Sequence, residues 1–151
     1  MSVSKIRTDI KTKLESIANI GKVNDYRRHH IDWPKIFESF VEDGKINACI
    51  IEWVDTDSEK IASGSVAIRR YHSFRIWYLY SMKDSTASAK SFEDILEEIM
   101  DEMDKTQAIG TDGARWFEPS KVVSIEEVPF SGVLVHRGQV LLSIEETGAF
   151  S

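Results

Sequence analysis

Hydrophobic and polar residues follow two different periods along this chain, and each period predicts its own kind of element. In residues 75–82, Arg-Ile-Trp-Tyr-Leu-Tyr-Ser-Met, β-branched and aromatic residues are densest and no glycine or proline interrupts them, which is typical of a strand. At period two the isoleucine and the tyrosines share one face, and the tryptophan and the leucine share the other. Because both faces are largely apolar, the pattern predicts a central strand covered on two sides.

Two stretches instead repeat their apolar residues at the three- and four-residue spacings of an amphipathic helix. In the first, residues 4–20, Ser4 is placed to cap the start and Gly21 follows as a stop signal. The second, residues 91–105, has apolar offsets of 0, 3, 4, 7 and 11. We expect both stripes to pack on a sheet. Their residues are Ile6, Ile10, Leu14 and Ile17, and then Phe92, Ile95, Leu96, Ile99 and Met103.

Shorter apolar runs predict the remaining strands, and polar stretches predict the connections between them. Strands are expected at residues 46–54, 61–70, 122–128 and 133–144, the last with a possible break at Arg137-Gly138. Connections are expected at residues 55–59, 71–73, 83–90 and 107–120, and a short helical segment after Trp33-Pro34. At residues 71–73 the alternative is a bulge within one long strand.

Together these elements predict one α+β domain over residues 1–151, a mainly antiparallel β-sheet packed by two main helices. The tail, residues 145–151, is expected to be frayed. At 151 residues, with 42% hydrophobic and 29% charged residues, the chain has the composition of a globular domain rather than a disordered one. No apolar run approaches the ~20 residues of a membrane span, and the N-terminus lacks the apolar centre of a signal peptide. The composition predicts a protein without a membrane partner that stays where it is made.

Candidate catalytic and metal-binding residues are few, so we expect neither an enzyme nor a bound cofactor or metal. Cys49, the single cysteine, lies in an apolar run and is expected to be a buried, inert thiol. The adjacent His29 and His30 would point to opposite sides of an extended chain and have no recognised zinc spacing. His72 and His136 stand alone in strand-like surroundings and are expected to be structural.

The helix predicted at residues 91–105 has an outer face that is nearly all acidic. Like charges four residues apart, such as Glu97 and Asp101, do not stabilise a helix. Helix propensity therefore does not explain the acidic run. We expect Glu97, Asp101 and Asp104 to be exposed and to face either a channel or a basic partner.

Arg115, Trp116 and Phe117 lie in the long glycine-rich connection predicted at residues 107–120. Connections of this length are usually functional or disordered, and two large aromatic residues disfavour disorder. One interpretation is that the aromatic residues attach the connection to its own domain. The other is that they contact a neighbouring subunit, because tryptophan and arginine are enriched at interface hot spots.

The order of the predicted elements is itself a pattern. It consists of an opening helix with Ile6, Ile10 and Leu14, a strand pair around residues 66–68 and 76–80, a helix at 92–103, and the closing segment 133–144, Val-Leu-Val-His-Arg-Gly-Gln-Val-Leu-Leu-Ser-Ile. This order resembles the tail-terminator (tail-completion) proteins of tailed bacteriophages. The resemblance covers nearly the whole chain as a pattern of elements and brings no catalytic residues with it.

The resemblance implies a structural virion protein that forms a ring, with a hexamer favoured. Such a ring terminates the tail tube, joins it to the head-side connector, and lets DNA pass through its channel. It implies a location in the tail or neck of the virion, and in the host cytoplasm during assembly. The net charge of −6 is compatible with this, because a channel that repels phosphates lets DNA slide.

Two other classes of protein stay open at this point. A small intracellular adaptor or inhibitor would dock on a basic partner through the acidic helix. A metal-dependent hydrolase would use strand groups such as Glu52 and Asp55 with Lys60, a combination found in many proteins without such activity.

Overall fold

The central element of the fold is β4 (Ala67–Ser81), which pairs antiparallel with β3 (Lys45–Lys60) on one side and with β6 (Val133–Ala149) on the other. The structure is a computed structural model that describes residues 2–24, 41–42, 45–61, 67–82, 88–105, 108–110, 113–130 and 133–149. The strand predicted from residue 75 onward is the second half of β4. Its central position is confirmed.

The remaining described strands extend the sheet on both sides. β5 (Ala114–Phe130) pairs antiparallel with β6, and β1 (Lys22–Asn24) pairs parallel with β3, which gives the order β1-β3-β4-β6-β5. β2 (Val41–Glu42) pairs antiparallel with the start of β3. The predicted fold class, α+β with a mainly antiparallel sheet, is confirmed.

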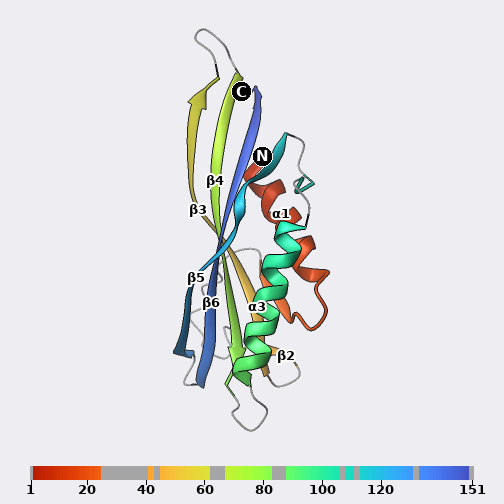
Figure 1. The fold of residues 1–151 in the computed structure, drawn as a ribbon, viewed down its shortest axis with the longest axis vertical. Helices are drawn as coiled ribbons and strands as arrows, with labels where there is room; N and C mark the ends of the chain where they lie inside the picture. Colours follow the sequence, from red (N-terminus) through yellow and green to blue (C-terminus); the bar gives the residue numbers. More distant parts are fainter. Residues whose placement is uncertain are drawn as a thin grey trace.

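Two helices, α1 (Ser2–Glu15) and α3 (Ser88–Asp104), lie on one face of this sheet (Figure 1). α1 contacts β1 and β3, whereas α3 contacts β4, β6 and β5. All residues of both predicted apolar stripes are buried, although Ile17 lies just beyond the end of α1. The helices cover only part of the length of the sheet, so the far ends of β3, β4 and β6 project beyond them (Figure 1).

The core between helices and sheet is organised around Tyr78. Its ring stacks on Phe92 of α3 with centroids 5.6 Å apart, and its hydroxyl donates to Asn47 Oδ1 at 2.7 Å. Asn47 Oδ1 also accepts from the Gly21 amide, and Asn47 Nδ2 donates to the Asn19 carbonyl. One asparagine on β3 therefore connects the turn after α1 to the main core.

The opposite face of the sheet has a smaller buried cluster and a charged band. Trp77 packs against this cluster, and the guanidinium groups of Arg75 and Arg137 lie 5.4 and 4.8 Å from the centre of its ring. Each arginine also pairs with a carboxylate, Arg75 with Glu52 at 3.5 Å and Arg137 with Glu126 at 3.0 Å. The buried residues are Ile46, Ala48, Ile50, Leu79 and Val135.

The connections predicted at residues 55–59 and 71–73 are wrong, because these residues pair with each other inside β3 and β4. Their polar side chains form cross-strand contacts, which outweigh turn-prone composition. Glu59 accepts a hydrogen bond from Tyr71 at 2.9 Å and pairs with Arg69 at 3.4 Å. The irregularity that we considered at residues 71–73 lies on the partner strand, as a register shift between Trp53 and Asp55.

The second half of the chain also contains more strand than predicted. The connection expected at residues 107–120 is largely replaced by β5, which begins at Ala114, and residues 145–149 belong to β6 rather than to a frayed tail. β6 has no break at Arg137-Gly138, because Gly138 is paired on both sides. Its missing side chain leaves room for Leu96 and Phe92, which would lie 2.9 and 3.1 Å from a Cβ at this position.

Helix boundaries differ from the predicted ones by a few residues. α1 spans Ser2–Glu15 rather than residues 4–20, so Ser4 lies inside it, and the left-handed residue after it is Asn19, with φ of 67°, rather than Gly21. α3 begins at Ser88, three residues before the predicted start at 91. The segment 25–40, with His29, His30 and the helix expected after Pro34, lies outside the described residues.

The contact between α3 and β6 gives a first prediction. Leu96 is 3% exposed, so Leu96→Ala should lower the free energy of unfolding by about 2–5 kcal/mol. Gly138→Ala should also destabilise, since its new methyl group collides with the Leu96 side chain, and the double variant should cost less than the two single losses added together. Urea unfolding of the four proteins measures this. A loss below about 0.5 kcal/mol for Leu96→Ala would show that α3 does not lie on the sheet.

Candidate interaction surfaces

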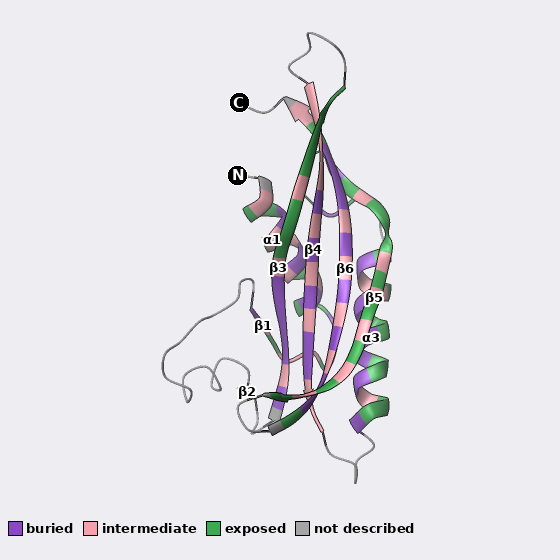
Figure 2. Cartoon of the chain, turned by 90° about the vertical axis from the view of Figure 1, so that its left-hand side faces the viewer, coloured by how far each residue is buried: buried purple, intermediate pink, exposed green. Residues whose placement is uncertain are grey.

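The acidic side of α3 faces away from the sheet. α3 contains seven carboxylates and one lysine, and Glu97, Asp101 and Asp104 are all exposed. The buried side of the helix is the apolar stripe, so the helix is divided lengthwise into a core face and an acidic face (Figure 2). The geometry leaves Glu97 and Asp101 available to a partner.

α1 carries the opposite charge beside α3. It has four basic residues and two acidic ones, and the two helices are in contact. At their junction Ser16 Oγ donates to Glu102 at 3.2 Å. The helix layer therefore has a basic part over β1 and β3 and an acidic part over β4, β6 and β5. The helix-covered face of the molecule therefore carries opposite charges on its two sides.

Asp104 differs from the other acidic residues of α3. Its carboxylate accepts hydrogen bonds from the amide and the hydroxyl of Ser120 on β5, at 2.8 and 2.9 Å. It therefore attaches the last turn of α3 to the edge strand. The sequence pattern grouped three acidic residues. Glu97 and Asp101 face solvent, whereas Asp104 is hydrogen-bonded to Ser120.

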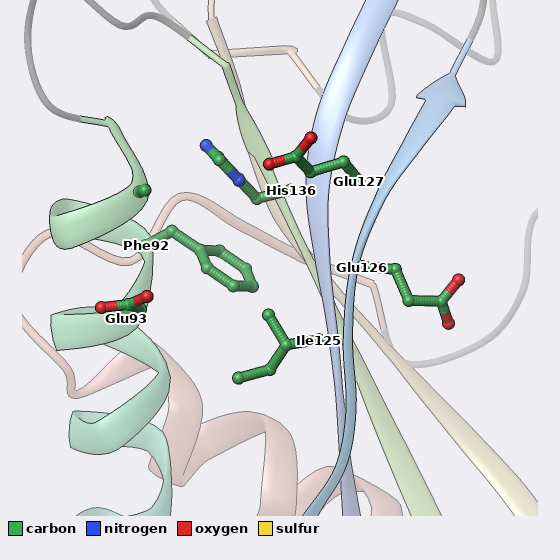
Figure 3. Close-up of a pocket in the computed structure, with 7 residues that line it drawn as sticks. Phe92, Glu93, Ile125, Glu126, Glu127 and His136 are labelled. Carbon is green, nitrogen blue, oxygen red and sulfur yellow. The ribbon is translucent and has the colours of Figure 1, made fainter.

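A pocket of about 320 Å³ opens between the first turns of α3 and the strands β5 and β6 (Figure 3). Its inner wall is His136, which is buried, bonded to Ser88 Oγ at 3.1 Å and stacked on Phe92 at 5.2 Å. Ile125 faces Phe92, whereas Glu126 points away (Figure 3). The lining residues are Ala89, Phe92, Glu93, Ile125, Glu126, Glu127 and His136. An aromatic base with carboxylates nearby suits a basic side chain.

The three residues proposed as a contact, Arg115, Trp116 and Phe117, lie on β5 and have different environments. Trp116 is half-buried and packs against the main core. Phe117 is 51% exposed, and its ring meets Tyr71 with centroids 5.0 Å apart. Arg115 pairs with Glu145 at 3.5 Å and keeps 57% of its side chain exposed. Trp116 is therefore attached to its own domain, whereas a contact of this segment with a neighbouring subunit stays a prediction, for which Phe117 and Arg115 are exposed.

His72, His136 and Glu52 have structural partners. His72 lies between Thr56 and Glu146, with Nδ1 2.8 Å from Thr56 Oγ1 and Nε2 2.9 Å from Glu146 Oε1. Glu52 pairs with Arg75 and accepts a hydrogen bond from the Trp77 indole at 3.2 Å. Within the described ranges, no group of three or more His, Cys, Asp and Glu side chains is arranged to bind a metal ion. Among the described helices, none combines the length and apolarity that a membrane span requires.

In comparisons with known proteins, the sequence matches no family model and no curated protein. Function is therefore inferred from the surfaces described above and from the resemblance in the order of elements.

Sequence reasoning missed the pocket beside α3 and the exposed apolar residues of the sheet edges. Trp53 and Val54, at 46% and 39% exposed, and Ile125, at 57%, all lie in runs that resemble core strands. The register shifts in β3 and β5, next to Trp53 and Val122, change which residues point inward. Period-two alternation contains no signal for such shifts.

Burial of Cys49 gives a prediction about pH. Cys49 is fully buried, as expected, and this burial raises the pKa of its thiol far above the ordinary value. The unfolded thiol ionises above pH ~8.5 while the folded one stays neutral, so this contribution to stability is present below that pH and lost as pH rises. Between pH 8.5 and 10, the unfolding free energy of the natural protein should fall more steeply than that of Cys49→Ala, by up to about 1.4 kcal/mol per pH unit.

Urea titrations at several pH values measure both slopes. The same burial effect raises the pKa of Tyr78, with smaller contributions from Cys49, Tyr80 and Glu98, but the unfolded phenol ionises only near pH ~10. The lower window therefore isolates the thiol. Parallel curves for the two proteins would show that Cys49 is accessible to solvent.

The two kinds of acidic residue on α3 give the next prediction. Glu97→Gln with Asp101→Asn should leave the unfolding free energy within about 0.5 kcal/mol of the natural value, or slightly raise it, because like-charge repulsion is relieved. Asp104→Ala should lower it by about 1 kcal/mol, since two hydrogen bonds to Ser120 are lost. Thermal and urea unfolding compare the variants. A large loss in the double variant would mean that those carboxylates are paired, and would remove them as a contact surface.

Proposed function

We propose that this protein is a structural component of a bacteriophage virion that forms a ring at the end of the tail tube and joins it to the head-side connector. The proposal is supported by the order of its elements, which resembles tail-terminator proteins, and by the α+β fold with a helix layer on one face of a mainly antiparallel sheet. DNA is the cargo of the channel rather than a bound ligand.

The observation that carries the proposal is the exposed acidic face of α3. Seven carboxylates lie on this helix, and among them Glu97 and Asp101 are exposed. α3 lies on one face of the sheet with its acidic side turned away from the sheet. If subunits join through the edges of their sheets, one face of each sheet would turn toward the ring axis. An acidic face there repels DNA phosphates over about 8–10 Å at physiological salt, and this repulsion lets DNA slide without adhering.

A second candidate function is an adaptor that docks on a basic partner. The observation that favours it is the pocket between α3 and β5, where Glu93 and Glu127 lie beside the aromatic rings of Phe92 and His136. In that case the acidic face and the pocket would form a single binding site for one basic segment. The oligomeric state separates the two functions, because an adaptor needs no ring.

Ring formation is tested by native mass spectrometry and light scattering, on the protein alone and with the products of neighbouring tail genes. We expect one closed species of about six subunits, since cyclic oligomers have a fixed number of members. A monomer or dimer under all these conditions would contradict the ring and favour the adaptor. Neighbouring genes for tail-tube and connector proteins would give independent support.

The position of the acidic face is tested with DNA. In the assembled ring, Glu97→Lys should cause retention of duplex DNA that weakens steeply with salt. Thr147→Lys is the control, since Thr147 is exposed on the opposite face of the sheet and a lysine there should retain less DNA. Equal retention by both variants would show that α3 does not line the channel.

A further inference from the structure

We propose that the pocket between α3, β5 and β6 is a docking site for an arginine side chain carried by an extended segment of a partner protein. The inference rests on the docking function proposed second above and deepens it, since it names the side chain that the protein recognises. It does not require the ring, because the pocket lies within a single subunit. The lining residues come from the first turns of α3 and from neighbouring positions of β5 and β6 (Figure 3).

The size and the lining of the pocket fit one long side chain. Its volume of about 320 Å³ is at the small end of the range for ligand pockets, so it has room for a side chain rather than for a large cofactor. Phe92 and Ile125 supply apolar surface, and the small side chain of Ala89 completes this part of the lining. Arginine and lysine bury an aliphatic stem along such surface and keep the charged end near water.

Two carboxylates of the pocket have no cation of their own in the described part of the chain. Glu93 on α3 and Glu127 on β5 are exposed, and neither forms an ion pair or a hydrogen bond with any described residue. The third carboxylate, Glu126, points away and is paired with Arg137 at 3.0 Å (Figure 3). A cation in the pocket therefore lies between an unpaired acid of the helix and an unpaired acid of the strand.

His136 is the buried polar residue of the pocket and offers an atom to the ligand. It is 5% exposed, and its Nε2 lies 3.1 Å from Ser88 Oγ. Among the described residues, Nδ1 has no hydrogen-bond partner. In the tautomer whose Nε2–H donates to Ser88 Oγ, Nδ1 is an acceptor. A guanidinium, with five N–H groups, can serve this nitrogen and both carboxylates better than an ammonium with three.

Exposed apolar surface beside the pocket indicates that the ligand extends beyond one arginine. Glu127 pairs with His136, and two residues further along Pro129 pairs with Leu134. Residues two apart on a strand share a face, so Leu134, which is 54% exposed, lies on the same face about 7 Å along the strand. An extended segment advances by the same amount every two residues. The recognised pattern is therefore an arginine and an apolar residue with one residue between them.

The rest of the acidic face of α3 adds attraction without selectivity. Glu97 and Asp101 are exposed further along the helix and do not line the pocket. Their charges attract any basic segment over about 8–10 Å at physiological salt. Loss of these charges should therefore change the salt dependence of binding, whereas a change in the pocket should alter which side chain is bound.

Short peptides with blocked ends test the site on the full-length chain. The probe is a fluorescent Gly-Leu-Ser-Arg-Ser-Leu-Gly, which carries the pattern in both chain directions, and a second peptide has neutral citrulline in place of arginine. Fluorescence anisotropy should show that the arginine peptide binds at least about tenfold more tightly, since charge-assisted hydrogen bonds are the stronger ones. A lysine peptide should fall between them. Equal affinity for the arginine and citrulline peptides, or no binding of the first, would overturn the site.

Charge variants of the protein locate the bound arginine. Glu93→Gln and Glu127→Gln should each weaken the arginine peptide by about threefold, and the double variant by about tenfold, as expected when ion pairs at a partly exposed site are lost. Asp94→Asn on α3 and Glu118→Gln on β5 are matched controls, because both residues are exposed and neither lines the pocket. The controls should bind like the natural protein. Equal losses in variants and controls would overturn the pocket as the site.

A variant that fills the pocket tests it without removing a charge. Ala89→Phe places a ring on the lining and should abolish binding, while the circular dichroism spectrum and the melting temperature stay close to the natural values, because Ala89 is exposed. The control is Lys90→Phe, the next residue, which is exposed and outside the lining and should not weaken binding. Leu134→Ser should weaken the arginine peptide but not a version with serine in place of both leucines.

Peptide binding and oligomeric mass are independent measurements, so the proposals fail separately. A ring that binds the arginine peptide through the pocket supports this inference and contradicts only the adaptor. A larger loss in Glu97→Gln with Asp101→Asn than in the pocket variants would keep docking on the acidic face and overturn the pocket. Spermidine that binds as tightly as the peptide would also overturn the inference, since the apolar contact would then contribute nothing.

Discussion

The arrangement of helices on this sheet depends on one part-buried hydrogen bond, from the Tyr78 hydroxyl to Asn47 Oδ1. An unpaired phenol in this core would carry the full cost of desolvation. The Asn47 side chain also accepts a hydrogen bond from the Gly21 backbone N–H and donates one to the Asn19 carbonyl. A Cβ at Gly21 would collide with the Asn47 carbonyl, so the chain leaves α1 in close contact with β3. The contacts of Asn47 therefore fix the position of α1 relative to the Tyr78–Phe92 stack.

Hydrophobic periodicity predicted the elements that bury one face and expose the other to solvent. Both helix stripes are buried as expected, because amphipathic spacing follows directly from burial against one surface. Strand length was underestimated where polar residues pair across the sheet. Glu59 and Tyr71 fall in segments predicted as connections, but they are hydrogen-bonded to each other between strands, and Glu59 also pairs with Arg69. A single sequence does not show which segments become neighbours.

The candidate contact residues show the same limit. Composition singled out Arg115, Trp116 and Phe117 but could not separate them, since inward and outward positions on β5 depend on register shifts that only the partner strand reveals. Asp104 was grouped with Glu97 by helical position, yet its bond to Ser120 comes from a strand that was expected to begin later. Charge and aromatic content could be assigned from the sequence, whereas the partner of each side chain could not.

The band around Trp77 has a mechanical consequence for the sheet. Glu52, Arg75, Trp77, Arg137 and Glu126 form a row of ion pairs and cation–π contacts that crosses four strands, β3, β4, β6 and β5. Sliding one strand along its neighbour would break several of these contacts at once, in addition to backbone hydrogen bonds. A second row, Glu59–Arg69–Glu145–Arg115, crosses the same four strands close to the projecting ends. The sheet is therefore braced against shear at two levels along its length.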